Sequence, residues 1–421
     1  MQTEFQNTLY THDNLFVLCG MNSEIADLIY LDPPFNSKRM YSGAIGSKAA
    51  GVSFKDMWTW SDINDGYLEK LMSNKHIGLA RFIRTIELSA DKAMMAYIAY
   101  MTQRIIELHR VLKPTGSFYL HCDPTASHYL KQVLDFVFGR KNFRNEIVWH
   151  YQAGTKGTKY FGRKHDIILF YSKSEQYKHK RVSKPVVNPE RYKHTDDDGR
   201  KYDINGQGKR YYLDDGQTCD DVWTWAYEKE FQQVNSQSKE KTGYPTQKPL
   251  ALLKRIIEAS SNVGDIVLDP FCGCATTCVA AQQLGRKWIG IDIEKQAVKL
   301  LIKRLSDDAG LFTNFIHLTT LPQRTDVERM EINPQTKNDI KKRLFKEQGC
   351  RCNGCDDEFE IRHFEVDHIV PKAKGGGDYF ENYQLLCSSC NRIKGDRPME
   401  YLRMKMQKME EALLKKITFG E

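Results

Sequence analysis

Short apolar runs alternate with amphipathic stretches through the first 150 residues and again from about residue 245 to 310, and this alternation constrains the fold most strongly. Leu28–Leu31 and Gly116–Leu120 have the length and composition of buried strands, whereas residues 127–138 repeat apolar side chains on one helical face. Strands that alternate with helices form a largely parallel sheet with helices on both faces. The sequence therefore predicts an α/β fold.

The charge of the chain favours a polyanionic partner. The formal net charge is +8, and residues 151–200 hold 12 Lys and Arg against 6 Asp and Glu, with aromatic residues among them. Cations bind phosphates and flat side chains stack on bases, so this mixture suits nucleic acid. A solvated surface with no partner is the alternative interpretation.

No uninterrupted apolar run approaches the roughly 18 residues that a membrane-spanning helix needs. The first residues also lack a basic stretch followed by an apolar one, the pattern of a secretory leader. We therefore expect a cytoplasmic protein without membrane association.

The segment Asp32-Pro33-Pro34-Phe35 directly follows a predicted strand. An acid at the carboxyl end of a strand faces the crevice where open α/β sheets bind ligands. Paired prolines stiffen the turn and leave carbonyl acceptors without competing N–H donors. A carboxylate, a carbonyl and an aromatic face suit a flat ring with an exocyclic amino group, although an ordinary Asp-Pro turn is the simpler alternative.

A second acid-tipped strand end, Asp269-Pro270-Phe271-Cys272-Gly273, precedes a predicted helix that begins near Thr276. Small residues in such a loop let a ligand approach the start of the helix. A further strand ends in Asp292, 23 residues after Asp269, close to the roughly 20-residue spacing at which an acid meets ribose hydroxyls. The loop contains no Lys, which favours a cationic or hydroxyl-rich ligand over a phosphate.

These motifs resemble those of the S-adenosylmethionine-dependent DNA methyltransferases that modify amino groups. The motif at residues 32–35 precedes the loop at 269–273, which is the permuted order of the β group, and residues 163–169 and 243–249 resemble two further family motifs. The resemblance covers residues 8 to 310 and implies a Rossmann-like domain with a mixed, mostly parallel sheet. The family usually has a second glycine where this chain has Ala275.

The resemblance also implies roles for individual residues. Asp32 and the Pro33 carbonyl would hold the amino group of a base flipped out of double-stranded DNA, and Phe35 would stack on that base. Pro34 completes this catalytic motif. The residues expected to bind the cofactor are Asp13, Lys248, Asp269, Pro270, Phe271, Gly273, Thr276 and Asp292, although Asp13 could equally cap a helix. The family pattern with Asp at the first position favours adenine N6, with cytosine N4 as the alternative.

Two Cys-x-x-Cys pairs, Cys352/Cys355 and Cys387/Cys390, have the spacing of a four-thiolate structural zinc site. The sequence around them resembles the HNH endonuclease module, a ββα fold that grips one divalent metal ion such as Mg²⁺. In that pattern His368 is the general base and Asn382 supports the loop, while Asp367 and Asn391 ligate the metal. A surface turn, or an HNH fold without activity, is the alternative.

These motifs divide the chain into five parts and predict a two-activity enzyme. We expect an adenine-specific DNA methyltransferase joined to an HNH endonuclease, as in restriction–modification; a cytosine-N4 enzyme, or a C-terminal module that only binds DNA, is the alternative. Relatives often form dimers, so a homodimer is one expected assembly. The parts are a catalytic half (1–171), a target-recognition insertion (172–242), a cofactor-binding half (243–310), a linker (311–340) and the HNH module (341–421).

Overall fold

The computed structural model describes most of the chain, and the following account is confined to that part. The described residues are 7–35, 39–42, 53–56, 76–152, 159–234, 238, 240–294, 298–304, 315–327, 334–369, 371–372, 377–397, 399, 401–402, 405–406 and 409.

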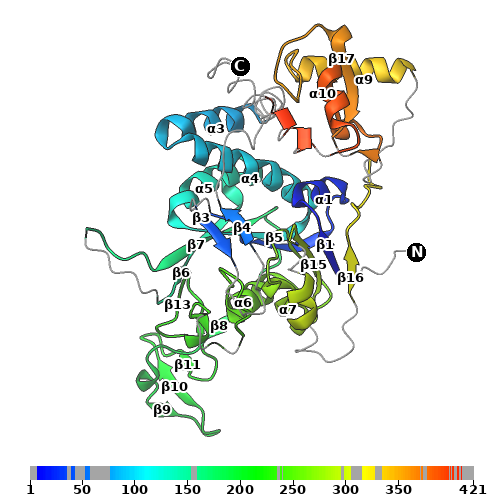
Figure 1. Cartoon of the computed structure of the whole chain (residues 1–421). Coiled ribbons are helices and arrows are strands. Elements are labelled where there is room, and N and C mark those ends of the chain that lie inside the picture. The colour runs from blue at the N-terminus through cyan, green and yellow to red at the C-terminus, as the bar shows by residue number, and fades with distance from the viewer. Residues whose placement is uncertain are drawn as a thin grey trace.

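A nine-stranded sheet forms the centre of the described structure (Figure 1). Only β7 runs antiparallel to its neighbours, β5 and β6, and the other pairings are parallel. The expected mixed, mostly parallel sheet is therefore confirmed. In spatial order its strands are β13 (Val222–Thr224), β6 (Phe143–His150), β7 (His165–Ser172), β5 (Leu112–Cys122), β2 (Ala26–Leu31), β14 (Ile266–Asp269), β15 (Lys287–Asp292), β1 (Thr8–Thr11) and β16 (Ile316–Leu318).

Helices cover both faces of this sheet, as the strand–helix alternation predicts. One apolar cluster joins a face of the sheet to α1 (Asn14–Gly20), α3 (Ile77–Ser89), α4 (Lys92–Val111) and α5 (Pro124–Phe138). A second cluster joins the opposite face to α6 (Leu250–Ser260) and α7 (Thr276–Gln283). Every residue of β2 is buried, because this central strand has helices on both sides.

The strand register places two sequence-distant segments at the same edge of the sheet. Leu268 of β14 lies opposite Ile29 of β2, and the two strands are parallel. Asp269 in turn lies opposite Gly290 of β15. Parallel neighbours end at a common edge, so the residues that follow β2, β14 and β15 converge there.

The polar region after β7 folds into short strands that project from the main sheet (Figure 1). β8 (Ser183–Lys184) pairs with β12 (Gln217–Thr218), and β9 (His194–Thr195), β10 (Lys201–Ile204) and β11 (Arg210–Tyr212) form a separate three-stranded sheet. β13 then returns to the edge of the main sheet. A small antiparallel pair, β3 (Arg39–Ser42) and β4 (Ser53–Asp56), follows β2.

The C-terminal part forms a small module with its own apolar cluster. Its elements are α9 (Pro334–Glu347), the antiparallel strands β17 (Phe364–His368) and β18 (Tyr383–Cys387), and α10 (Ser388–Lys394), which give the expected ββα arrangement. Within the range expected to be a linker, β16 instead pairs with β1 at the edge of the main sheet. The spacing of apolar residues in the sequence could not predict this strand, because the strand is only three residues long.

The C-terminal module lies beside α1 and α4 of the larger domain (Figure 1). The Tyr379 hydroxyl donates to the Cys19 carbonyl in α1 at 3.4 Å. Ile369 packs against the apolar cluster that includes α1 and α4. Among the helices described, none is both long and apolar enough to cross a membrane.

Candidate active site and metal centre

Three acids of the predicted motifs lie at the common edge of the sheet. Asp32 follows β2, Asp269 ends β14 and Asp292 ends β15, and these strands are neighbours. The charge of Asp32 contributes to raising the pKa of Asp269, which shows that the two carboxyl groups lie within electrostatic range of each other. The structure therefore brings the two predicted motifs to the same edge of the sheet.

The two carboxylate oxygens of Asp32 have different surroundings. Oδ2 accepts a hydrogen bond from Lys248 Nζ at 2.5 Å. Oδ1 is buried and has no hydrogen-bond partner among the described residues. A buried acceptor without a donor costs about 1–3 kcal/mol, so this atom marks a place for a donor that a ligand supplies.

A series of hydrogen-bonded side chains lies next to the motif Asp32-Pro33-Pro34-Phe35. The Tyr30 hydroxyl lies 2.9 Å from His121 Nδ1, and His121 Nε2 lies 3.0 Å from Asp166 Oδ2. The Tyr151 hydroxyl donates to the other oxygen of Asp166 at 2.9 Å. The Phe35 ring stacks on the His121 ring with a centroid separation of 5.9 Å. These contacts hold the Phe35 ring in place near Asp32.

Asp166 belongs to the 163–169 motif and is largely buried. Burial alone would raise the pKa of its carboxyl group, but the hydrogen bond and charge of His121, followed by the charge of Lys248, lower that pKa overall. Asp166 therefore adds a negative charge next to His121. His121 was not among the predicted site residues, because a single buried His in a strand carries no local signal.

Two of the acids predicted to bind the cofactor, the buried Asp269 and the partly buried Asp292, accept backbone hydrogen bonds. Asp269 Oδ1 accepts from the Phe271 amide at 3.0 Å, and Asp292 Oδ2 accepts from the Gly273 amide at 2.7 Å. Burial raises the pKa of Asp269 to about 7, and the charges of Asp32 and Asp292 add to the rise. Burial likewise raises the pKa of Asp292 to about 6. Both carboxyl groups would be stabilised as anions by a cationic ligand.

The backbone of this loop is left-handed at two positions. Gly273 has φ of 49°, and a Cβ atom there would lie 3.0 Å from the Tyr244 ring. Ala275, which replaces the family's second glycine, has φ of 58° at the start of α7. A non-glycine residue in this conformation costs roughly 1–2 kcal/mol. Arg304 Nη1 donates to the Thr276 hydroxyl at 2.9 Å and to the Cys274 carbonyl at 2.8 Å, and these hydrogen bonds stabilise the loop.

Asp13 acts as the cap of α1 in this structure. Its Oδ1 accepts from the Leu15 amide at 2.8 Å, and both of its oxygens lie 3.2 Å from Arg104 Nη2. Arg104 Nε also donates to Asn14 Oδ1, and Asn14 Nδ2 donates to the Pro270 carbonyl. Asp13 thus connects through Arg104 and Asn14 to the predicted cofactor loop, while its direct contact with a cofactor stays a prediction.

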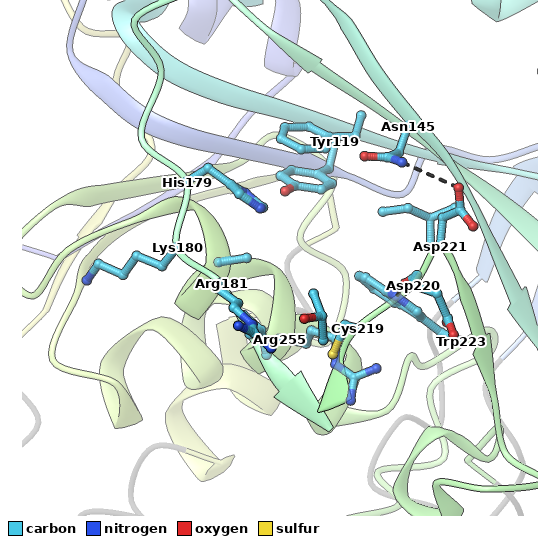
Figure 2. Close-up of a pocket in the computed structure, with 15 residues that line it drawn as sticks. Tyr119, Asn145, His179, Lys180, Arg181, Cys219, Asp220, Asp221, Trp223 and Arg255 are labelled. Atoms are coloured by element: carbon cyan, nitrogen blue, oxygen red, sulfur yellow. Dashed lines mark hydrogen bonds between the residues drawn. The ribbon is translucent and has the colours of Figure 1, made fainter. Parts of the chain in front are cut away.

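A separate cavity of about 370 Å³ lies between the sheet, α6 and the start and end of the recognition insertion (Figure 2). Tyr119 and Phe170, which stack at 4.3 Å between centroids, contribute to its sheet side. His179, Cys219 and Trp223 contribute to the insertion side. None of the predicted site residues lines this cavity, which is therefore separate from the acids at the edge of the sheet.

The four cysteines of the two Cys-x-x-Cys pairs converge in the C-terminal module. The Sγ atoms of Cys352, Cys355, Cys387 and Cys390 all lie within 4.8 Å of one another. Four thiolates at this separation can hold one metal ion, and a tetrahedral set of sulfur ligands is the usual arrangement around zinc.

His368 ends β17, and Asn382 directly precedes β18, so the two residues stand at opposite ends of the segment that joins these strands. His368 Nε2 lies 2.9 Å from Asp378 Oδ1, which also accepts from the Tyr383 hydroxyl at 2.7 Å. The Asn382 side chain donates through Nδ2 to the Gly377 carbonyl at 3.0 Å. The backbone carbonyl of Asn382 accepts from the Ile369 amide. In this structure Asp378, which the sequence did not single out, is the side chain that holds the His368 ring.

The two residues predicted to ligate a divalent metal each have a partner and a remaining oxygen. Asp367 Oδ2 forms an ion pair with Lys394 Nζ at 2.9 Å and accepts a hydrogen bond from Gln384 Nε2 at 2.8 Å. Asn391 Nδ2 donates to Glu365 Oε2 at 2.5 Å. The Oδ1 atoms of Asp367 and Asn391 accept no hydrogen bond from the described part of the chain. Oxygen donors of this kind fit a hard divalent cation.

Two family models match separate parts of the chain. Residues 26–304 match the family model described as DNA methylase, and residues 352–397 match the model described as HNH endonuclease. The Type II methyltransferase M.EcaI of Enterobacter cloacae is 29% identical over 362 residues, which are 69% of this chain and 78% of that protein. The DNA adenine methyltransferase YhdJ of Escherichia coli strain K12 is 29% identical over 326 residues, 72% of this chain and 85% of that protein.

Solved structures also resemble the larger domain. The PvuII DNA methyltransferase, described as cytosine-N4-specific, is 13% identical and superposes with a TM-score of 0.42 over 75% of this chain and 96% of that chain.

The four-cysteine cluster predicts one bound zinc ion per chain. We expect Cys387→Ser to abolish stoichiometric zinc and to unfold the C-terminal module, because a module of this size has a small core that a metal must supplement. Zinc content by atomic emission, with proteolysis of the module, would measure both effects. Cys350→Ser is the matched control, since Cys350 is exposed and lies outside the cluster; equal zinc loss in both variants would contradict the assignment.

Proposed function

Because the chain belongs to the DNA methylase family, whose model matches residues 26–304, and also has an HNH endonuclease domain, we propose that it modifies and cuts DNA. In this proposal the larger domain transfers a methyl group from S-adenosylmethionine to N6 of a flipped adenine in double-stranded DNA. The C-terminal domain is an endonuclease, and the two activities serve restriction–modification. The names of the Type II relatives support that setting.

The observation that carries the methyltransferase proposal is the unpartnered Oδ1 of Asp32. An aromatic amine is a poor nucleophile because its lone pair is delocalised into the ring. Asp32 Oδ1 would accept one N–H of the amine and the Pro33 carbonyl the other, which shifts the nitrogen towards pyramidal geometry. Phe35 would stack on the base and fix its orientation, and such positioning supplies much of the rate acceleration.

The acid-lined cleft fits S-adenosylmethionine, which when bound supplies the methyl group as a sulfonium cation. Asp269 is buried, Asp292 is partly buried and both have raised pKa values, so a cationic ligand would compensate their mutual repulsion. Gly273 leaves space in front of the Tyr244 ring that a side chain would fill. The proposed cofactor contacts are therefore Asp292 and the residues of the 269–276 loop, which include Asp269, Pro270, Phe271 and Thr276.

Asp32 also supports adenine over cytosine, since the family's cytosine-N4 members mostly have Ser at that position. Cytosine N4 remains the second candidate, because the two amines present the same pair of N–H donors. The recognition insertion, with its exposed Tyr211 and the cations beside it, is the proposed DNA-reading element.

The methyltransferase proposal predicts N6-methyladenine in DNA treated with the protein and S-adenosylmethionine. Unmethylated DNA would be incubated, digested to nucleosides and analysed by mass spectrometry. Asp32→Asn should lower the methylation rate by a factor of about 100 or more, because it replaces a charged acceptor by a neutral one. N4-methylcytosine alone would select the second candidate, and unmodified DNA would contradict the proposal.

Cofactor binding should strengthen as the pH rises from about 6 to 8. Asp269 and Asp292, with pKa values raised to about 7 and about 6, must lose protons before they can attract a cation. The affinity should therefore rise about 20-fold between pH 6 and pH 8, as both groups become ionised, and level off above it. Calorimetry with S-adenosylmethionine would measure the trend.

Asp269→Asn is the control for this pH dependence, since it keeps an oxygen for the Phe271 amide and removes the titrating group. The variant should bind more weakly and show a flatter profile than the wild type. Identical profiles in both proteins would contradict the involvement of Asp269.

The endonuclease proposal rests on the arrangement of His368, Asp367 and Asn391 on the ββα module. His368 would take the proton of the attacking water, and Asp378 holds its ring in place. Asp367 and Asn391 would hold a divalent metal such as Mg²⁺ through their remaining oxygens; when bound, the metal polarises the phosphate. A zinc-stabilised module that only docks the methyltransferase on DNA would need none of these three side chains.

His368→Ala should abolish DNA nicking in the presence of Mg²⁺ and leave methylation intact, because the general base is lost while the methyltransferase cleft is untouched. Conversion of supercoiled plasmid to open circles would measure nicking, and His363→Ala in the same module is the matched control. Persistent nicking by the His368 variant would show that another group is the base. Absence of nicking in the wild type on both modified and unmodified plasmid would favour the docking role.

A further inference from the structure

We propose that Lys248 is a positioning residue for the catalytic carboxylate: it holds one oxygen of Asp32 so that the other faces the amine of the target base. This inference rests on the proposed methyltransferase function and assigns to Lys248 a role other than the cofactor contact that the sequence predicts. The two residues are separated by 216 positions in the chain and meet only in the fold.

The contact between these residues is close and shielded from solvent. Lys248 Nζ lies 2.5 Å from Asp32 Oδ2, and the side chains are 8% and 17% exposed. A carboxylate can exchange its two oxygens by rotating about its terminal bond. A buried ammonium at one oxygen restrains that rotation, and the unpartnered Oδ1 is then left in a single orientation.

The backbone that presents Lys248 is itself fixed. The Gln247 side chain accepts from the amide and hydroxyl of Thr242 at 2.9 and 2.7 Å and donates to the Glu240 carbonyl at 2.8 Å. The Glu240 carboxylate accepts from the Leu250 amide at 3.0 Å, at the start of α6. Lys248 therefore extends from a segment whose backbone is held by hydrogen bonds on both sides, which suits a residue that must hold another side chain in place.

Lys248 also lies beside the proposed base platform. Its Nζ is 5.3 Å from the centroid of the Phe35 ring, which stacks on His121. One cation thus contacts both the acceptor of the amine and the ring on which the base stacks. It also offsets the negative charge that Asp32 would otherwise add to the acids at this edge of the sheet.

Two other roles for Lys248 make different predictions. A cofactor contact would affect mainly the affinity for S-adenosylmethionine. An ammonium that occupies the amine site until DNA arrives would compete with the base, so its removal would strengthen DNA binding and raise the rate. A positioning role instead requires that kcat falls while cofactor affinity is preserved.

The experiment compares full-length wild type with Lys248→Met, Lys248→Arg and Lys248→Ala. We expect Lys248→Met to lower kcat for methyl transfer by about 100-fold, the loss that a misplacement of about 1 Å causes. The dissociation constant of S-adenosylmethionine should change by less than about threefold. Lys248→Arg should recover part of the rate, and ethylammonium chloride should partly restore Lys248→Ala, with potassium chloride at the same ionic strength as control.

Lys173→Met is the matched control variant, because Lys173 is a partly buried lysine whose Nζ binds the Leu112 carbonyl and lies outside the Asp32 motif. It should retain the wild-type kcat. A Lys248→Met enzyme with unchanged or raised kcat, or with cofactor affinity weakened as much as the rate, would overturn the positioning role. If the wild type itself transfers no methyl group to DNA, the proposed function fails instead.

Discussion

The gathering of three buried or partly buried carboxylates at one edge of a mostly parallel sheet is the constraint on which the larger domain depends. An uncompensated buried charge costs several kcal/mol, so each acid needs its own donors. Backbone amides serve Asp269 and Asp292, whereas Asp32 has the ammonium of Lys248. The sheet order makes this possible, because β2, β14 and β15 are neighbours and deliver all three acids to the same edge. The compensation is incomplete, because the charges of Asp32 and Asp292 still help to raise the pKa of Asp269.

The sequence predicted the fold well where the signals are local. The buried run of β2 lies directly before Asp32, and the buried run of β14 ends in Asp269, a few positions before the small residues that precede α7. The two Cys-x-x-Cys pairs are similarly compact, and the structure brings their four sulfur atoms together. The edge strand β16 was missed because three residues carry too little periodicity to distinguish a strand from a linker.

The supporting contacts of the site could not be predicted, because they join residues far apart in the chain. His121 and Asp166 are 45 positions apart, Asp13 and Arg104 are 91 apart, and each pair meets only after the sheet has formed. A buried His in a strand, or an Arg in an amphipathic helix, looks the same in sequence whether it supports a site or packs in a core. Its role depends on strand order, and strand order is a property of the whole domain.

Contacts between residues far apart in the chain also connect the C-terminal module to the larger domain. Ile369 directly follows His368 in the chain and packs against the apolar cluster of the larger domain, and Tyr379 directly follows Asp378 and donates to the Cys19 carbonyl. Both members of the His368–Asp378 pair are therefore adjacent in the chain to residues that contact the larger domain. The geometry of the proposed nuclease base is set partly by the methyltransferase domain. A C-terminal fragment on its own would lose these anchors, so its activity would not represent the activity of the intact chain.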